Sequence, residues 1–238
     1  PIDAVSICTP PHLHYENILA AFDKDLPVFC EKPLFWESNI GFNESIRKLN
    51  ILKNHPKRNL FLNTSNNIFI KYIMSELYYD NNITYFLFRF YTNGNNINYD
   101  IVVDLLPHGV GIIQSLFGEH EARNFIYNSD KNRFNCKFKY NGCDVEFDFK
   151  EHPEIEKLFV IQLNDRIFKR LQNGTGKNYK VCINDEQNNR VVSLPDPFKV
   201  YLSDFIRSCN TRSSKIIDNF DTAYFNQKTI LEFLEKLT

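Results

Sequence analysis

The sequence predicts a mixed fold, in which the C-terminal part of a parallel α/β sheet precedes an α+β domain with an open, mainly antiparallel β-sheet and helices. Two observations predict this class. Residues 4–30 have the order and length of one strand, helix and strand unit. Residues 134–149 alternate between apolar and polar side chains on both sides of an Asn-Gly pair, as expected of an antiparallel hairpin. We therefore expect a first domain over residues 1–63 and a second over residues 64–238.

The first strand is predicted over residues 4–8, an apolar run typical of a strand buried on both sides in a parallel sheet. Pro10 and Pro11 end it. Pro11 suits a first helical turn, where its missing N–H would be unbonded anyway, and Thr9 is a candidate cap. The apolar stripe of the helix that follows consists of Tyr15, Ile18, Leu19 and Phe22. A second strand is expected over residues 28–30.

Candidate ligand-binding residues follow these strands directly, because open parallel sheets bind ligands at the carboxyl ends of their strands. The segments at those ends are Thr9-Pro10-Pro11 and Glu31-Lys32-Pro33. The proline after Lys32 biases this lysine toward extended geometry, which favours a positioned cation. For a lysine taken alone, a solvated surface side chain is the more common interpretation.

The order of strand, Thr-Pro-x-x-x-His, helix with paired alanines, strand and Cys-Glu-Lys-Pro-Leu resembles the Gfo/Idh/MocA oxidoreductases, the family of glucose–fructose oxidoreductase and inositol dehydrogenase. The resemblance implies that residues 1–63 are part of a Rossmann-type domain that binds NAD or NADP. The residues that it places beside this cofactor are Thr9, Pro10, Pro11, His14, Glu31, Lys32 and Pro33. It further implies hydride transfer between the nicotinamide and a hydroxyl or ketone of a sugar, sugar derivative or cyclitol.

Members of this family open with a strand, a G-x-G-x-x-G turn and a helix, which hold the dinucleotide pyrophosphate upstream of the Thr-Pro segment. The 238 residues contain eight glycines and no such cluster. The two G-x-G occurrences, at 109–111 and 174–176, lack the third glycine and the strand-to-helix context. We therefore interpret the chain as a fragment or truncated product of a longer dehydrogenase and expect the pyrophosphate site to be missing.

Composition limits the kinds of partner that the chain could bind. A formal net charge of −1 without a basic run gives no electrostatic footprint for nucleic acid, and no uninterrupted apolar stretch reaches the ~18 residues that predict a membrane span. The six cysteines show no C-x-x-C or other metal spacing, and Cys8 and Cys30 fall in predicted strands. We therefore expect reduced thiols, no metal site and a cytoplasmic location.

A helix over residues 40–52 and a short strand over residues 60–62 complete the predicted first domain. Asn63 follows this strand. Members of the family usually have an N-x-R-[FY] motif there, and this chain has Asn63-Thr64-Ser65-Asn66, without the arginine. The resemblance implies that Asn63 binds substrate. A helix over residues 68–77 and a strand over residues 83–90 begin the second domain.

Asp104 and His108 form the next candidate site. Pro107 predicts a helix start, and His108 then lies opposite the apolar stripe of that helix. A lone histidine on a helix is commonly a hydrogen-bonded core residue, but a position off the stripe favours a cleft. Asp104 can reach the imidazole and stabilise its protonated form, as a carboxylate that orients a general acid or base does. This spacing resembles the catalytic pair of the family, which implies a catalytic and substrate-binding set of Lys32, Asp104 and His108. Gly111 stands where members commonly have an aspartate that contacts substrate.

The remaining chain predicts an open antiparallel sheet closed by two helices. Asn141-Gly142 suits a type I′ turn, and further strands are expected over residues 159–163, 179–183 and 190–194. The aromatic face of this sheet either packs on helices or forms a subunit interface, and the resemblance implies a homo-oligomer. The two closing helices are anchored by Val200, Phe205 and Ile206 and by Ala223, Ile230, Phe233 and Leu234.

The predicted function is an NAD(P)-dependent sugar or cyclitol dehydrogenase, with two alternatives left open. A non-catalytic sugar-binding, regulatory or degenerate member of the same fold is favoured by the missing glycine-rich turn and by Gly111, whereas Lys32, Asp104 and His108 favour an enzyme. A structural oligomer organised by the aromatic sheet accounts for the hairpin but not for the Glu-Lys-Pro turn.

Overall fold

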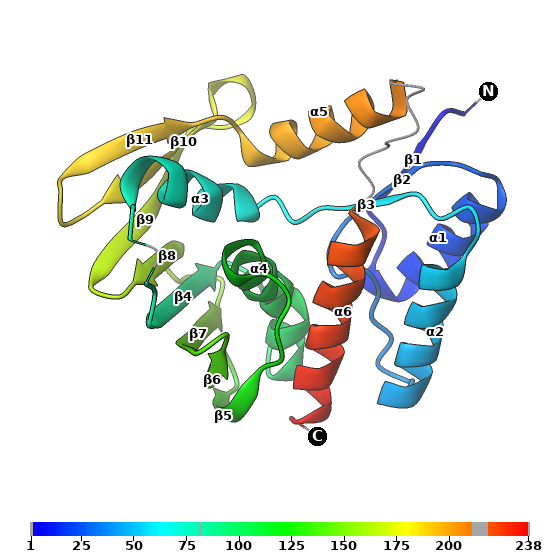
Figure 1. The fold of residues 1–238 in the computed structure, drawn as a ribbon, viewed down its shortest axis with the longest axis horizontal. Coiled ribbons are helices and arrows are strands. Elements are labelled where there is room, and N and C mark those ends of the chain that lie inside the picture. The colour runs from blue at the N-terminus through cyan, green and yellow to red at the C-terminus, as the bar shows by residue number, and fades with distance from the viewer. Residues whose placement is uncertain (1, 81, 211–218, 238) are drawn as a thin grey trace. The chain divides into compact units, whose positions relative to one another are not determined.

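The computed structural model describes residues 2–80, 82–210 and 219–237. The chain forms two compact units, one of residues 1–65 with 198–238 and one of residues 66–197 (Figure 1). The first boundary lies close to the predicted division at 63/64. The predicted second domain, however, extended to residue 238, whereas residues 198–238 fall in the first unit. Two side chains of the C-terminal part account for this, because Asn219 bonds both the N–H and the carbonyl of Leu62, and Gln227 donates to the carbonyl of Phe35.

The first unit contains a three-stranded parallel sheet of order β1-β2-β3. The strands are β1 (Val5–Ile7), β2 (Val28–Cys30) and β3 (Leu60–Leu62). The helices are η1 (Pro11–Leu13), α1 (His14–Asp23), α2 (Phe42–Asn54), α5 (Pro197–Asn210) and α6 (Phe220–Glu235). These elements confirm the predicted strand, helix and strand unit.

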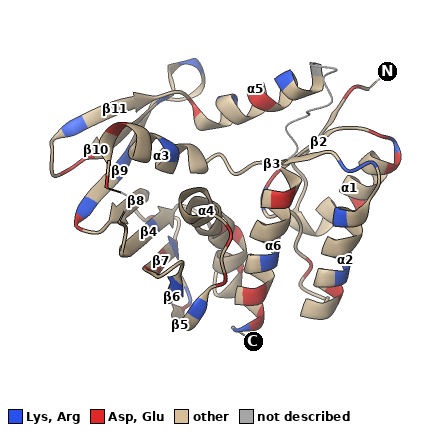
Figure 2. Cartoon of the chain, in the orientation of Figure 1, with Lys and Arg blue, Asp and Glu red and all other residues tan. Residues whose placement is uncertain are grey.

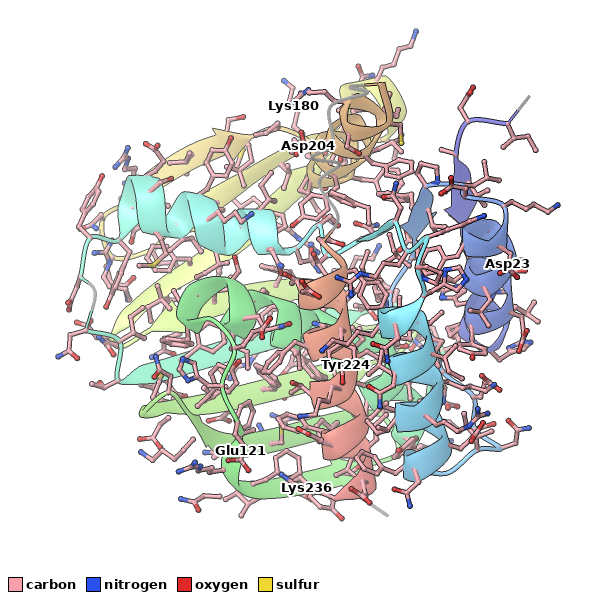
Figure 3. All side chains as sticks on the ribbon, turned by 45° about the vertical axis from the view of Figure 1, so that its right-hand side comes forward. Asp23, Glu121, Lys180, Asp204, Tyr224 and Lys236 are labelled. Atoms are coloured by element: carbon pink, nitrogen blue, oxygen red, sulfur yellow. The ribbon has the colours of Figure 1, made fainter. Side chains whose placement is uncertain are left out.

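The sheet of the first unit buries a different cluster on each face. One cluster joins Val28 and Leu60 to side chains of α1, α2 and α6, and the other joins Phe29 and Phe61 to Phe205 of α5. On α6, Tyr224 points toward α2 (Figure 3), where its hydroxyl donates to Asn50 Oδ1 at 3.0 Å. The two closing helices therefore complete the core of this unit rather than that of the second.

Two expectations for the start of the chain differ from the structure. Strand β1 lies at an edge of the sheet, so Ser6 and Cys8 are exposed, whereas a strand buried on both sides was predicted. Thr9 does not cap the following helix; its hydroxyl accepts a hydrogen bond from Asn17 at 3.3 Å. In both cases the outcome depends on other parts of the chain, which the local sequence pattern does not specify.

The second unit is built on an eight-stranded sheet of order β11-β10-β9-β8-β4-β7-β6-β5, in which β4 and β7 pair in parallel and the other neighbours are antiparallel. This confirms the open, mainly antiparallel sheet. The strands are β4 (Tyr85–Thr92), β5 (Arg123–Asp130), β6 (Arg133–Tyr140), β7 (Cys143–Glu151), β8 (Leu158–Leu163), β9 (Arg166–Asn173), β10 (Lys180–Asp185) and β11 (Arg190–Leu194). The helical segments are α3 (Asn67–Tyr72), η2 (Ile73–Leu77), α4 (Tyr99–Phe117) and η3 (Gly176–Asn178).

The predicted hairpin is β6–β7. Asn141 and Gly142 both have positive φ angles, 49° and 79°, as a type I′ turn requires. The aromatic side chains of its inner face are buried against α4, and Gly109 lets the helix approach closely, because a Cβ at Gly109 would lie 2.9 Å from the Phe147 ring. The aromatic face is thus a helix-packing face. The opposite face carries ion pairs, among them Asp148 with Arg89 and Arg133, both at 2.8 Å. Figure 2 shows basic residues along β6.

Helix α4 begins at Tyr99, well before Pro107, so the predicted helix start at Pro107 is wrong. Pro107 removes one backbone hydrogen bond inside the helix. Burial of the residues around it, including Leu105 and Leu106, holds the helix together nonetheless. By length and composition α4 could also cross a membrane, but 67% of its apolar window is buried inside the unit, as in the core helix of a soluble domain.

Candidate functional site

In the first unit, the predicted ligand-binding residues meet at the carboxyl ends of three neighbouring strands. Asn63, which follows β3, donates from Nδ2 to Glu31 Oε1 at 2.8 Å. The N–H of Asn63 bonds the carbonyl of Cys30, and the N–H of Glu31 bonds that of Ile7. The backbone hydrogen bonds between the parallel strands therefore continue one residue past the strand ends. They hold the side chains of Glu31 and Asn63 next to each other.

His14 connects the loops after β1 and β2. Its ring is 1% exposed, with Nδ1 2.9 Å from the carbonyl oxygen of Pro33 and Nε2 2.7 Å from that of Thr9. A neutral imidazole donates from one ring nitrogen, and only the doubly protonated ring donates from both. The family resemblance implies that His14 lies beside a cofactor. In the structure its ring is occupied by these two backbone carbonyls, so that its side chain positions the loops.

Lys32 lies on the loop that His14 and α6 hold. The Lys32–Pro33 peptide is cis, and Lys32 is partly exposed, as is Glu31. Further along this loop the N–H of Trp36 bonds the carbonyl of Pro11 at 3.2 Å, and Gln227 of α6 bonds Phe35. Burial raises the pKa of the Cys30 thiol well above its ordinary value, so this neighbour stays protonated. The accessible groups at the strand ends are therefore Thr9, Pro10, Glu31 and Lys32.

In the second unit, His108 lies between an amide and an aromatic ring. Asn66, just before α3, places its Nδ2 2.9 Å from His108 Nδ1. With this orientation of the amide, Nδ1 accepts the hydrogen bond, and the proton of the neutral ring is on Nε2. The ring of Phe90 packs edge-on against the imidazole at 5.4 Å. Sequence reasoning missed Asn66, although an asparagine-rich segment at the predicted domain boundary is a signal that could have found it.

Glu151, at the end of β7, also belongs to this site. Its side chain is 0% exposed, and Oε2 accepts a hydrogen bond from the N–H of Asn96 at 3.1 Å. Within the described ranges, Oε1 receives no hydrogen bond. Burial, followed by the adjacent Asp104 carboxylate, raises the pKa of Glu151 to about 7. Asp104 thus has a buried carboxyl partner, which lies two residues beyond the end of the predicted hairpin and continues its inner face.

Residues 1–55 match the model of an oxidoreductase family with an NAD-binding Rossmann fold, the Gfo/Idh/MocA family. The resemblance to the Gfo/Idh/MocA oxidoreductases is confirmed. Among solved structures, UDP-N-acetylglucosamine 3-dehydrogenase from Acidithiobacillus ferrooxidans has a TM-score of 0.67 and 14% identity, over 99% of this chain and 77% of that one. An oxidoreductase from Thermotoga maritima has a TM-score of 0.64 and 12% identity, over 98% and 75%. At these identities the likeness shows the fold. No curated protein matches the chain.

Gly111 marks a departure from the Gfo/Idh/MocA pattern, which commonly has an aspartate there. A Cβ at Gly111 would lie 2.8 Å from Asn67 Oδ1. Asn67 is 6% exposed, and its Oδ1 is without a hydrogen bond among the residues that the structure describes. The amide of Asn67 therefore occupies the space beside α4 into which a larger side chain at position 111 would extend.

The Gfo/Idh/MocA resemblance also implies a catalytic set that draws on both units. Lys32 lies in the first unit, and Asp104 and His108 lie one helical turn apart in the second. The structure describes each half of this set, and its assembly into one site stays a prediction. Over the described part of the chain, no group of three histidine, cysteine or acidic side chains could hold a metal ion.

Proposed function

We propose that this chain serves an NAD(P)-dependent oxidoreductase that acts on a hydroxyl or ketone of a sugar, sugar derivative or cyclitol. The observation that carries the proposal is the Glu31-Lys32-Pro33 loop, held at the carboxyl end of β2 by His14 and Asn63. The family match over residues 1–55 supports the cofactor class. One structural neighbour is a UDP-N-acetylglucosamine 3-dehydrogenase, which supports a sugar substrate.

The residues at the strand ends fit the nicotinamide side of the cofactor. Thr9 and Pro10 are exposed, and Glu31 and Lys32 are partly exposed at an edge where open parallel sheets bind nucleotides. Bound NAD or NADP supplies the hydride chemistry, and the protein supplies placement. In this proposal the Lys32 ammonium group polarises the substrate oxygen and stabilises the negative charge that develops on it.

His108 is the proposed general acid or base. Because Asn66 holds Nδ1, we assign the proton transfer with the substrate hydroxyl to Nε2. Asp104 stabilises the imidazolium that forms, as a carboxylate near a protonated ring does. Burial and the adjacent Asp104 raise the pKa of the Glu151 carboxyl group to about 7, so that below this pH Glu151 holds a proton and the negative charge of the pair stays on Asp104.

A non-catalytic sugar-binding or regulatory protein of the same fold is the second candidate. The amide of Asn67 beside Gly111 favours it. Asn67 fills the space that the substrate-contacting aspartate of family members would need at position 111. Homo-oligomerisation through the open face of the eight-stranded sheet and a cytoplasmic location are further parts of the main proposal.

The test combines cofactor binding with turnover. Fluorescence titration with NADH and NADPH compares this chain with a version extended upstream through a glycine-rich turn, and nicotinamide absorbance then follows turnover of a panel of sugars and cyclitols. Lys32→Ala is expected to lower kcat/KM by about 10²- to 10⁴-fold at an unchanged unfolding midpoint. Lys24→Ala, which removes an exposed lysine after α1, is the matched control. Equal turnover of the two variants would remove Lys32 from the mechanism, and absence of cofactor binding to both chains would favour the non-catalytic candidate.

A further inference from the structure

Strand β9 carries an arginine, Arg170, on the inner, mainly apolar face of the eight-stranded sheet. Phe168, two residues earlier on the same face, is 1% exposed, and Arg170 pairs in register with the buried Ile183 of β10. Arg170 itself is partly exposed. The residue as a whole is therefore accessible in part, although apolar side chains surround it.

Three aromatic rings surround this guanidinium group. The Cζ of Arg170 lies 4.4 Å from the ring centroid of Phe159 and 5.5 Å from those of Phe69 and Phe90. Contacts with ring faces stabilise a cation, but they do not satisfy the N–H donors around the edge of the guanidinium plane. The rings thus hold the group in place and leave its hydrogen-bonding capacity for another partner.

Arg170 makes no ion pair or hydrogen bond with the residues that the structure describes. The contrast with Arg166, on the same face of β9, is informative, because Arg166 pairs with the buried Asp185 of β10. Within the described residues, the sheet provides a carboxylate partner for Arg166 but not for Arg170. Loss of surrounding water lowers the pKa of Arg170 to about 10, which still leaves it charged at neutral pH. A partly desolvated, unpaired guanidinium group attracts an oxyanion strongly and binds it through two parallel hydrogen bonds.

The position of Arg170 connects it with the candidate site. The Phe90 ring that contacts Arg170 also packs against the imidazole of His108. The Phe69 ring belongs to α3, which begins directly after Asn66, the residue that bonds His108. Arg170 and His108 therefore contact the same aromatic ring in the same unit.

We propose that Arg170 binds an oxyanion, a phosphate or a carboxylate, of a sugar substrate whose reacting carbon lies near His108. This inference rests on the proposed function and makes it more specific, because it assigns the substrate to the anionic sugars. Neutral sugars and cyclitols would leave the guanidinium group without a partner and are expected to bind more weakly. Arg170 is then a residue that determines specificity, separate from the residues assigned to proton transfer.

Calorimetric titration of the whole chain, with and without NADH, tests this assignment. The probes are glucose, glucose 6-phosphate, glucuronate and UDP-N-acetylglucosamine, so that a phosphate, a carboxylate and a neutral sugar are compared directly. At least one anionic sugar is expected to bind at least about tenfold more tightly than glucose, the factor that one charge-assisted interaction contributes. Arg170→Met keeps an apolar stem among the rings and should abolish this preference. Arg123→Met, which removes an exposed arginine at the far edge of the sheet, should retain it.

The outcomes separate this inference from the proposed function. Equal binding of glucose and the anionic sugars, or a preference that survives Arg170→Met, would overturn the role of Arg170, whatever the turnover. A preference lost in Arg170→Met without nicotinamide-dependent turnover would support the anion site and leave the hydride chemistry without support. If Arg170→Met does not fold, Arg170→Lys decides: it keeps the charge but loses the two-pronged geometry, so an unchanged preference would contradict the assignment.

Discussion

The carboxyl group of Glu151 is buried at the end of β7 and faces the carboxylate of Asp104, one helical turn before His108. Two carboxyl groups in contact favour a state in which they share one proton. Glu151 is the more buried of the two, so the proton is favoured there, although the hydrogen bond from the Asn96 N–H acts in the opposite direction. Asp104 then keeps its negative charge toward the histidine.

This relationship predicts how stability changes with pH. Burial and Asp104 raise the pKa of Glu151 to about 7 in the folded chain, from an ordinary value of 4.5. The folded state binds the proton more tightly, so the stabilisation is fully present below the unfolded pKa and is lost as pH rises through about 7. Glu151→Gln removes this titration while keeping a hydrogen-bond donor. We expect its free energy of unfolding to decline less than that of the wild type between about pH 5 and about pH 8, by up to about 3 kcal/mol.

Urea unfolding across that pH range measures the effect. Glu146→Gln is the matched control, since Glu146 lies on the outer face of the same strand and is paired with Lys137. Parallel curves for the wild type and Glu151→Gln would show that Glu151 does not hold the proton.

Gly94 provides the space that the Glu151 carboxyl group occupies. A Cβ at Gly94 would overlap Oε2 and Cδ of Glu151. Because this carboxyl group is enclosed and bonded to Asn96, it cannot move aside at low cost. We expect Gly94→Ala to destabilise the chain by about 1–3 kcal/mol, the usual cost of overpacking. Gly41→Ala is the control, because nothing lies within 4 Å of its Cβ position. Thermal unfolding that is equal in the two variants would contradict this packing.

The role of His14 as a connector of two loops predicts a cost in stability. His14→Ala leaves the carbonyl oxygens of Thr9 and Pro33 without their partner and opens a cavity under α1. The carbonyl of Pro33 is buried, and an unsatisfied buried group costs about 1–3 kcal/mol, whereas the carbonyl of the exposed Thr9 can bind water instead. Together with the cavity, a loss of about 2–4 kcal/mol is expected in chemical unfolding. His12→Ala removes an exposed histidine two residues earlier and should change the midpoint little. A midpoint of His14→Ala close to that of His12→Ala would exclude the bridging role.

The sequence predicted the fold best where the local structure depends on residues that are adjacent in the chain. Asn141-Gly142 predicted the hairpin turn, because the positive φ angles there depend on those two residues alone. The short strands around Lys32 were predicted from continuous apolar runs and the prolines between them. Strand β5 was missed, since its side chains are almost all exposed and show no alternation. Strand β9 was missed for a related reason, as charged residues interrupt its pattern.

The candidate site was predicted less completely, because its contacts join distant parts of the chain. Lys32, Asp104 and His108 were found through local motifs. Asn66 belongs to the site because it bonds His108, and Glu151 because it contacts Asp104. These pairs are far apart in the sequence, so no local spacing predicts them. The start of α4 was misplaced because Pro107 was taken as a first-turn residue, whereas tertiary packing carries the helix across it.

The exposure of the cysteines predicts that the thiol of Cys8 reacts fastest. Cys8 is exposed after the edge strand β1, whereas Cys30, Cys136 and Cys143 are buried and burial raises their thiol pKa values, which lowers the thiolate fraction. Titration of the native chain with a chromogenic disulfide reagent should show a fast phase that Cys8→Ser abolishes, while Cys143→Ser leaves it intact. Denaturant should make the buried thiols react at the rate of a model peptide. Cys182 and Cys209 are partly exposed and should react more slowly than Cys8. A fast phase that is unchanged in Cys8→Ser would contradict the exposure of Cys8 after β1.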